Sequence, residues 1–316
     1  MHTTGNLDVL IRSELWSATL KEALKDELRA TGYVDWLSGF PDGSTFTIPS
    51  IGDASVRDYV EDQAIQYDAM DTGEFQFTIG TYVSAATYIT KKARQDAFYA
   101  SRLESSFVPK QLRAIMEKLE TDIMALGAGG ASGGQTAASQ NQINGADHRW
   151  VASGTNEVIT VADFAKALFS LKKANVPDRN LIAIVDPSVE YTINTLSNLT
   201  SVANNPKWEG IITSGIASGM RFVKNVYGFD VYTSNYLATA NETINGKTTA
   251  AGKANLFFSA DSSVLPFVGA WRQHPEVDGE YNKDFQREEY VTTARYGLKV
   301  YRPENLVCVL ADTDQV

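Results

Sequence analysis

The sequence has little of what membrane crossing, secretion or disulfide formation requires. It contains one cysteine, Cys308, in the apolar run 306–310, which favours a buried structural thiol over a nucleophile and excludes an internal disulfide. No apolar stretch approaches the roughly 18 residues that span a bilayer. The N-terminus, MHTTGNLDVL, lacks the charged and apolar regions of a secretory signal. We therefore expect a cytoplasmic product that does not contact a membrane.

Histidine is equally scarce. The three histidines, His2, His148 and His274, lie far apart in the sequence, and none is part of an H-E-x-x-H motif. His274 precedes a proline in an acidic neighbourhood and is predicted to be a surface-loop residue. We expect no metal site and no cofactor.

Catalytic motifs occur only as partial matches. Residues 130–134 fit G-x-S-x-G, but a helix is predicted before them and a linker after them, the reverse of what a nucleophile elbow needs. Residues 246–248 resemble the end of a phosphate-binding loop, but Asn241 stands where that motif requires glycine. The pair Glu61 and Asp62 is interpreted as part of a charged loop. The chain is predicted not to be an enzyme, although a hydrolase with an unrecognised site stays open as an alternative of a different class.

Positive charge is in deficit, with 28 Lys and Arg against 38 Asp and Glu, a formal net charge of −10. This argues against a protein that binds free nucleic acid, which needs basic patches to neutralise phosphates. Lysine is absent between Lys25 and Lys91, and the segment 53–74 is strongly acidic.

Three helices are expected from apolar residues at a 3.6-residue period. The first runs from about Val9 to Ala30 and ends at Gly32. The second is capped by Ser105 or Ser106, carries Pro109 in its first turn and is stopped by Gly127. The third begins after Thr160. Its inner face is predicted to consist of Phe164, Ala165, Leu168 and Leu171.

Strands are expected where apolar residues alternate or form short runs. The alternating segments are 45–48 and 75–79, and the later strands are 255–259, 289–301 and 306–310. The Gly-, Ser- and Asn-rich segment 127–157 is predicted to be a flexible connection, and 238–254 a second polar loop.

Residues 176–237 read as a strand, a helix and a hairpin. The run Leu181–Val185 suits a buried strand, and Asp186 followed by Pro187 is a strong helix start. The chain then returns through 220–226, turns at Gly228 and continues through 229–233.

These segments, VPDRNLIAIVDPSVEYTINTLSNL and VKNVYGFDVYTSNYL, together with the closing YGLKVYRPENLVCVL, resemble tailed-phage major capsid proteins. The similarity covers most of residues 80–316 and is greatest to T-seven-like short-tailed phages. The resemblance implies an α+β, HK-ninety-seven-type capsid fold. It further implies an N-terminal arm (1–40), an extended loop (41–80), a peripheral domain with a long spine helix and an antiparallel sheet (81–160 and 255–316) and an axial domain (161–254).

The function implied by the resemblance is assembly rather than catalysis. Many copies are expected to form pentamers and hexamers that close into an icosahedral head around double-stranded DNA, which the wall encloses without sequence-specific binding. A separate scaffolding protein, a portal protein and a possible cement protein are the expected partners. The expected location is the virion, after assembly in the host cytoplasm. An encapsulin-like nanocompartment shell is the alternative within the same fold, and a surface adhesin is less consistent because no secretion signal is found.

Contacts between subunits are expected to pair an acidic extended loop with a basic strip on a neighbour. The loop residues are Asp53, Arg57, Asp58, Glu61, Asp62, Asp68, Asp71 and Glu74. The basic residues are Lys91, Lys92 and Arg94, or Lys110, Arg113 and Lys118. Some capsids of this fold are cross-linked through an extended-loop lysine. Because this loop has none, the shell is expected to be held together non-covalently.

Overall fold

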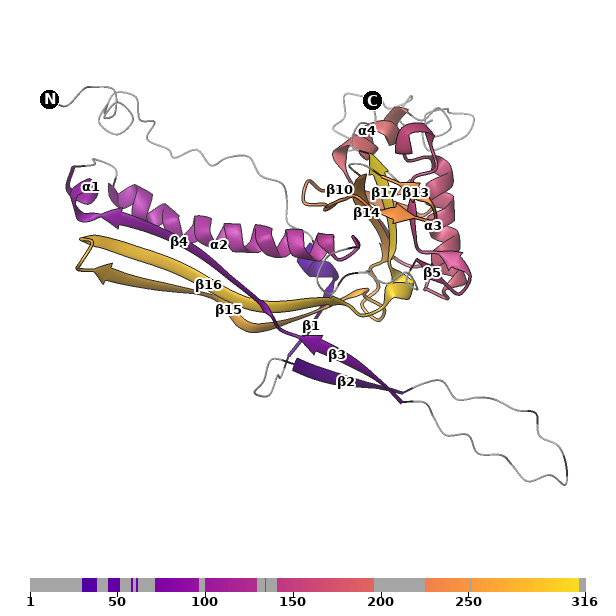
Figure 1. Ribbon diagram of the computed structural model, residues 1–316, viewed down its shortest axis with the longest axis horizontal. Coiled ribbons are helices and arrows are strands. Elements are labelled where there is room, and N and C mark those ends of the chain that lie inside the picture. Colours follow the sequence, from indigo (N-terminus) through magenta and orange to yellow (C-terminus); the bar gives the residue numbers. More distant parts are fainter. Residues whose placement is uncertain are drawn as a thin grey trace, which may run out of the picture.

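The described residues form two main sheets, a wide one near the C-terminus and a long one that carries the hairpin of β2 (Thr45–Ile51) and β3 (Thr72–Thr78) at one end (Figure 1). The computed structural model describes residues 30–38, 45–51, 58, 61, 72–96, 100–129, 134, 141–195, 225–249 and 252–312. The predicted N-terminal helix, from about Val9 to Ala30, lies outside the described residues except for its last residue, Ala30. There a 3-10 helix, η1 (Ala30–Tyr33), is found instead.

The wide sheet has the strand order β7-β17-β14-β8-β10-β9, with β11 pairing β14. Its strands are β7 (Arg149–Val151), β8 (Leu181–Val185), β9 (Asn225–Val226), β10 (Phe229–Thr233), β11 (Thr239–Ala240), β14 (Gly252–Ser259) and β17 (Val307–Asp312). β14 runs antiparallel to β17 and β8. β7 runs parallel to β17, and β10 runs parallel to β8 but antiparallel to β9. The predicted strands 181–185, 255–259 and 306–310 are confirmed.

Both faces of the wide sheet are buried. Successive residues of β14 alternate between two clusters: Phe257 packs with α3 and α4, whereas Leu256 and Phe258 pack against the end of α2 and η1. Burial on both faces explains why the central strands β8 and β17 are nearly continuous apolar runs.

The predicted strand-helix-hairpin module is confirmed within the described residues. Asp186 accepts hydrogen bonds from the backbone N (3.1 Å) and hydroxyl (2.6 Å) of Ser188, which caps α4 (Pro187–Thr195). β9 and β10 pair as a hairpin, and Tyr227 and Gly228 supply the positive φ angles of its turn.

The third predicted helix is α3 (Val161–Lys173). Its cap is formed mainly by Asp163, whose buried carboxylate accepts from Thr160 N (2.8 Å) and Thr160 Oγ1 (2.9 Å). Asp163 also accepts from Trp150 Nε1 (3.1 Å), which fixes the helix start to β7. On the predicted inner face Phe164 and Leu171 are buried, while Ala165 and Leu168 are only partly buried.

The prediction that 127–157 is a flexible connection is wrong for its second half. Residues 141–157 form β5 (Gln142–Ile143), β6 (Ala146–Asp147), β7 and the 3-10 helix η3 (Thr155–Glu157). Asn144 and Gly145 both have positive φ and make the tight turn between β5 and β6. Trp150 in β7 is buried against α3, so this stretch contributes to a core despite its polar composition.

The predicted polar loop 238–254 is also more ordered than expected. It contains β11, the paired β12 (Thr243–Ile244) and β13 (Lys247–Thr248), and the start of β14. The Asn245-Gly246 turn, with φ of 52° and 79°, closes the β12–β13 hairpin.

The long sheet has the order β1-β15-β16-β4. Its strands are β1 (Val34–Leu37), β4 (Thr81–Thr90), β15 (Phe267–Asn282) and β16 (Arg287–Val300). The predicted strand 289–301 corresponds to β16, but β15 and β4 were not predicted. His274 lies in β15 rather than in a loop, and its ring stacks on Trp271 with centroids 5.3 Å apart. A 3-10 helix, η4 (Pro303–Asn305), follows β16 and leads into β17.

Two helices accompany the long sheet, α1 (Lys91–Asp96) and α2 (Ala100–Ala125). The predicted start of α2 at Ser105 or Ser106 is wrong, because the helix begins at Ala100 and Pro109 lies inside it. A proline there removes one backbone hydrogen bond, which a long helix packed along a sheet can lose without breaking. The predicted stop at Gly127 is confirmed. Within the described residues, none of the helices combines the length and apolar content that a bilayer crossing requires.

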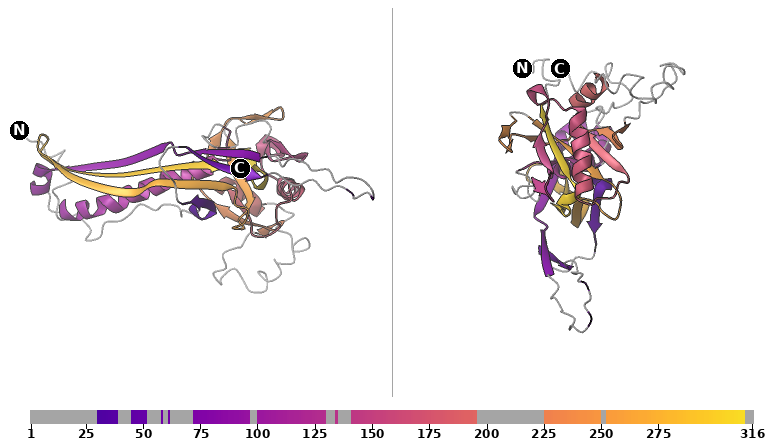
Figure 2. Two further views of the ribbon diagram at one scale, coloured as in Figure 1. Left: turned by 90° about the horizontal axis from the view of Figure 1, so that it is seen from below. Right: turned by 90° about the vertical axis from the view of Figure 1, so that its right-hand side faces the viewer.

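The extended hairpin consists of β2 (Thr45–Ile51) and β3 (Thr72–Thr78), which pair antiparallel and confirm the two predicted alternating segments. Figures 1 and 2 show the long sheet as a curved ribbon with α2 along one face. α1 lies at one end, and β2–β3 projects beyond the other end.

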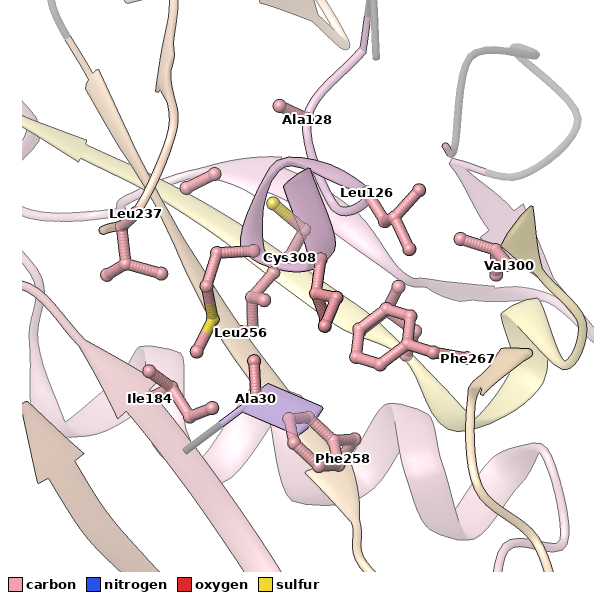
Figure 3. Close-up of a cluster of buried hydrophobic side chains, with 14 of the residues drawn as sticks. Ala30, Leu126, Ala128, Ile184, Leu237, Leu256, Phe258, Phe267, Val300 and Cys308 are labelled. Atoms are coloured by element: carbon pink, nitrogen blue, oxygen red, sulfur yellow. The ribbon is translucent and has the colours of Figure 1, made fainter. Parts of the chain in front are cut away.

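The two sheets share one core where they meet (Figure 3). Leu256, Phe258 and Cys308 of the wide sheet pack there with Phe267 and Val300 of the long sheet. The last turns of α2 and η1 complete the cluster through Leu119, Ile123, Leu126 and Ala30. This junction makes one folded unit of two differently shaped parts.

Candidate assembly surfaces

The β2–β3 hairpin is anchored at its base to the long sheet. Phe77 and Ile79, 0% and 2% exposed, pack on Val268 and Ala270 of β15 in a small cluster of their own. Phe75 lies edge-on to Tyr301, with ring centroids 5.0 Å apart. The hairpin therefore leaves the sheet in a fixed direction.

Polar contacts reinforce this anchor. Lys299 donates through Nζ to the carbonyl of Gln76 (2.7 Å) and lies over the ring of Phe75 (4.5 Å). Arg295 donates to the carbonyl of Ile79 (3.2 Å). Gly297 allows the close approach of the chains, since a Cβ there would lie 2.8 Å from the carbonyl oxygen of Thr78.

The acidic side chains predicted on the extended loop are only partly described. Asp58, Glu61 and Glu74 are exposed. The other predicted members, Asp53, Arg57, Asp62, Asp68 and Asp71, lie outside the described residues. The contact between this loop and a neighbour stays a prediction.

The predicted basic residues fall on two helices. Lys91, Lys92 and Arg94 are exposed on α1, at the far end of the long sheet from the hairpin. Lys110, Arg113 and Lys118 lie on α2, of which Arg113 is half-buried. The two alternative groups thus lie on different helices, and which of them contacts a neighbour stays a prediction.

Several of these cations already have partners in their own chain. Arg94 pairs with Glu288 of β16, Arg113 with Glu117 (3.0 Å) and Lys118 with Asp122. Lys91, Lys92 and Lys110 form no ion pair with another described residue. They are therefore the better candidates for a partner on a neighbouring molecule.

One face of the long sheet is fastened to α2. Gln111 donates to the carbonyl of Tyr290 (3.0 Å) and accepts from the hydroxyl of Thr292 (2.8 Å). Tyr296 donates to Asp122 Oδ2 (2.6 Å), and burial, followed by this carboxylate, raises the pKa of its hydroxyl far above the usual value. The helix and sheet are thereby held in one register.

The opposite face is rich in exposed aromatic residues and is covered by no described helix. Tyr82 and Tyr88 of β4 are 60% and 57% exposed, and Phe285, in the turn between β15 and β16, is 65% exposed. The guanidinium of Arg287 lies over the rings of Tyr88 (4.5 Å) and Phe285 (4.7 Å) and pairs with Glu289 (2.5 Å). Such a face is typical of a surface that meets another molecule.

A buried ion pair joins three segments beside the wide sheet, those around Gly129, Arg149 and Glu242. Arg149, 3% exposed at its side chain, pairs with Glu242 (2.6 Å), which also accepts from the backbone N of Gly129 (2.5 Å). Cys308 lies beside them, and burial raises the pKa of its thiol to about 12. The expectation of a buried, unreactive cysteine is confirmed.

A second buried carboxylate fixes the point where the N-terminal segment enters. Glu120 of α2 is 0% exposed and accepts from the backbone N of Ala30 through both oxygens (2.9 and 2.8 Å). Sequence analysis missed Glu120 and Glu242, because a buried glutamate in an amphipathic helix or a polar loop looks the same as a solvated one.

None of these groups forms a reaction centre. Among the described residues, no three His, Cys, Asp or Glu side chains lie close enough to hold a metal ion. The two nitrogens of the buried His148 ring contact the carbonyls of Ala146 (3.2 Å) and Glu304 (3.1 Å). Gly246 occupies a hairpin turn, and most of the G-x-S-x-G match, 130–133, lies outside the described residues. The described residues instead form exposed surfaces, together with buried contacts that fix the hairpin and the helices to the sheets.

The comparisons with known proteins agree with this arrangement. A family model described as phage capsid protein matches residues 71–309. Comparison with curated protein sequences finds no significant relative.

Solved structures of phage shells share the fold. The capsid of cyanophage P-SCSP1u superposes with a TM-score of 0.69 at 16% identity, covering 98% of this chain and 95% of that one. Mycobacterium phage Che8 gives 0.64 at 18% identity, covering 94% and 96%. The mature capsid of bacteriophage PhiM1 gives 0.64 at 12% identity, covering 98% and 94%. The greater similarity to T-seven-like phages stays a prediction.

Proposed function

The chain belongs to the phage capsid protein family, and from this premise we propose that many copies assemble through pentamers and hexamers into an icosahedral head around double-stranded DNA. It is a structural protein of the capsid and not an enzyme. The observation that carries the proposal is the match over residues 71–309 together with a long sheet that the described residues cover on one face only. The comparisons do not favour a nanocompartment shell or a hydrolase.

The two sheets suggest how the chain is divided into domains. We assign residues 1–40 to an N-terminal arm, 41–80 to the extended loop and the long sheet with α2 to the peripheral domain. The wide sheet would be the axial domain. We propose that this domain also takes in β14 and β17 from the predicted segment 255–316, since β17 pairs with β14 and β14 pairs with β8. A rigid axial part and a long arm suit a subunit that contacts several neighbours at once.

The shell is proposed to be held by non-covalent contacts. The absence of lysine between Lys25 and Lys91 leaves the extended loop without an amine for an isopeptide bond. Lys91 and Lys92 are the proposed partners of the acidic loop on a neighbouring copy. The other proposed partners are a scaffolding protein, a portal protein and a cement protein, with assembly in the host cytoplasm.

The first test is whether the purified chain, alone and with co-expressed neighbouring genes, forms shells or rings in sedimentation and negative-stain microscopy. Particles of several megadaltons are expected. A monodisperse monomer or dimer under every condition, scaffold included, would overturn the proposal. A cargo enzyme inside the particles would instead identify a nanocompartment.

The contact itself is tested with the double variant Lys91→Glu and Lys92→Glu. Reversing two charges should reduce particle yield severalfold and weaken the dependence of assembly on salt, because ion pairs at a surface are screened. The matched control reverses Lys172 and Lys173, two exposed lysines at the end of α3 in the wide-sheet part. Equal losses in both variants would argue for a general charge effect instead.

A further inference from the structure

The strand β4 is an edge without the usual protection. Among the described residues it pairs with β16 only, so its other side presents unpaired backbone donors and acceptors along ten residues. Its sequence, TYVSAATYIT, contains no charged residue, no proline and no glycine. An edge of this kind is a template for pairing with another chain.

The opposite edge of the same sheet is protected. Beyond its short pairing with β1, β15 has register shifts between Trp271 and Gln273 and between Gln273 and Glu276. It also carries a proline and charged side chains at Arg272, Pro275, Glu276, Asp278 and Glu280. Bulges, proline and charge are the features that keep an edge strand from pairing. These features are present on β15 and absent from β4, which indicates that another chain covers the edge of β4.

We infer that the edge of β4 binds the β4 of a second copy, antiparallel, around a two-fold axis through Ala85. This inference rests on the proposed assembly of the chain with copies of itself and specifies one of its contacts. A strand whose pairing partner is itself can carry no charge near its centre without placing like charges together. The composition of β4 meets that condition.

The faces of β4 determine the register. The odd-numbered residues Thr81 to Ile89 lie on the α2 side, because Thr292 and Tyr296, the β16 partners of Ala85 and Thr81, hydrogen-bond to α2. Tyr82, Ser84, Ala86 and Tyr88 are exposed on the other face. A two-fold axis normal to the sheet places the α2 helices of both copies on the same side of the joined sheet. The exposed, even-numbered residues of one β4 must therefore lie opposite even-numbered residues of the other.

Centring on Ala85 satisfies this rule and matches side chains by size. Tyr82 of one copy then lies opposite Tyr88 of the other, and Ser84 lies opposite Ala86. Small residues in the middle let the backbones approach, and an aromatic pair on each side of them covers the exposed rings.

Charges at the ends agree with the same register. Thr90 of one copy reaches the level of Gly80 of the other, which brings α1 with Lys91 and Lys92 toward the base of the second copy's β3. Glu74 is exposed on that strand. The register therefore puts the lysines of one copy at the base of the strand that carries Glu74 in the other, outside the uncharged pairing segment.

The test uses Ser84→Cys and Ala86→Cys, each small and on the exposed face. The native Cys308 is buried and gives little background. In the inferred register, residue 84 of one copy lies directly opposite residue 86 of the other, with Cβ atoms about 4.5–5.5 Å apart, so that a small approach of the strands reaches the separation of about 3.5–4.5 Å that a disulfide spans. The same position in two copies lies on a diagonal of about 7–8 Å, beyond that reach.

Assembled particles are treated with oxygen and copper phenanthroline and analysed on non-reducing gels. Particles co-assembled from both single variants should give disulfide-linked dimers, and each variant alone should give at least tenfold less. Particles without cross-linked dimers would overturn the inference while leaving the capsid assignment intact, and so would equal cross-linking of each variant alone. Failure of the unmodified chain to form particles would overturn the proposed function itself.

Discussion

The two sheets of this chain differ in how far the rest of the described chain covers them. The wide sheet is buried on both faces, by α3 and α4 on one side and by α2 and η1 on the other. The long sheet is fastened to α2 on one face and exposes Tyr82, Tyr88 and Phe285 on the other. The first is covered by other parts of its own chain, whereas the second has an open face and an open edge, which we propose that neighbouring molecules cover. On this proposal, stability and assembly depend on different strands and can be changed separately.

The largest effect is expected in the wide sheet, from Phe257→Ala. Phe257 is fully buried, and its ring lies edge-on to Phe164 (5.1 Å) and Phe229 (5.4 Å). Its truncation should lower the free energy of unfolding by ~3–5 kcal/mol, because the three rings cannot collapse into the space left. Chemical denaturation of the unassembled protein measures this. A loss below about 1 kcal/mol would mean that the wide sheet is not the stabilising core.

A smaller effect is expected where the hairpin joins the long sheet, from Gly297→Ala. The added Cβ would lie 2.8 Å from the carbonyl oxygen of Thr78 and 3.0 Å from the Cα of Ile79, and these backbone atoms cannot move aside independently. We expect a loss of about 1–3 kcal/mol. Because the shift falls on the base of β2–β3, proteolysis of the hairpin should accelerate as well.

The comparison matched to Gly297→Ala is Gly145→Ala. Gly145 is a turn glycine with open space around it, so that any cost there reflects its positive φ instead of a clash. If the two substitutions expose the β2–β3 hairpin to protease equally, the close packing at Gly297 does not determine its direction.

The wide-sheet part should also respond to acid through His148. Burial lowers the pKa of this imidazole, partly offset by its contacts with the carbonyls of Ala146 and Glu304. The unfolded chain therefore binds a proton first as the pH falls below about 6.5, and stability decreases with falling pH by at most ~1.4 kcal/mol per unit. Denaturation of His148→Gln from pH 7.5 to 5 should show a shallower slope. Parallel pH curves for both proteins would contradict this assignment.

The smallest effect on stability is expected in the long sheet, from Tyr82→Ser. A side chain that is 60% exposed should change the free energy of unfolding by no more than about 0.5 kcal/mol. Particle yield, measured by sedimentation, should nevertheless fall, since the ring is lost from the inferred β4 contact. Reduced stability with unchanged yield would reverse the contrast between the two sheets.

The parts of the fold that could be predicted are those with strong local signals. The run Leu181–Val185 and the Asp186-Pro187 helix start belong to the wide sheet, where burial on both faces leaves a clear apolar pattern. β15 has no such pattern, since its residues from Glu276 to Glu280 are exposed on both faces. It is held by pairing with β16 rather than by burial. Its strand character comes from a partner that is adjacent only after folding.

The candidate site shows the same limit. Charge counts identified Lys91 and Lys92 as cations near an acidic loop, but could not show that Arg94 is already paired with Glu288, 194 residues away. The unprotected edge of β4 was also not recognised from sequence, although its lack of charge is visible there. An absence of charge becomes informative only when the strand is known to be an edge.

Among the described residues, the long sheet carries one layer of helix, and this determines how much polypeptide each unit of capsid wall area requires. A wall of one sheet and one helix is only roughly 20 Å thick, about 10 Å for each layer. A strand of 16 residues, by contrast, reaches roughly 50 Å along the wall. Each polypeptide thus tiles a large area for its mass, and the enclosed volume grows faster than the area tiled. A thin, wide subunit lets a short gene enclose a long genome.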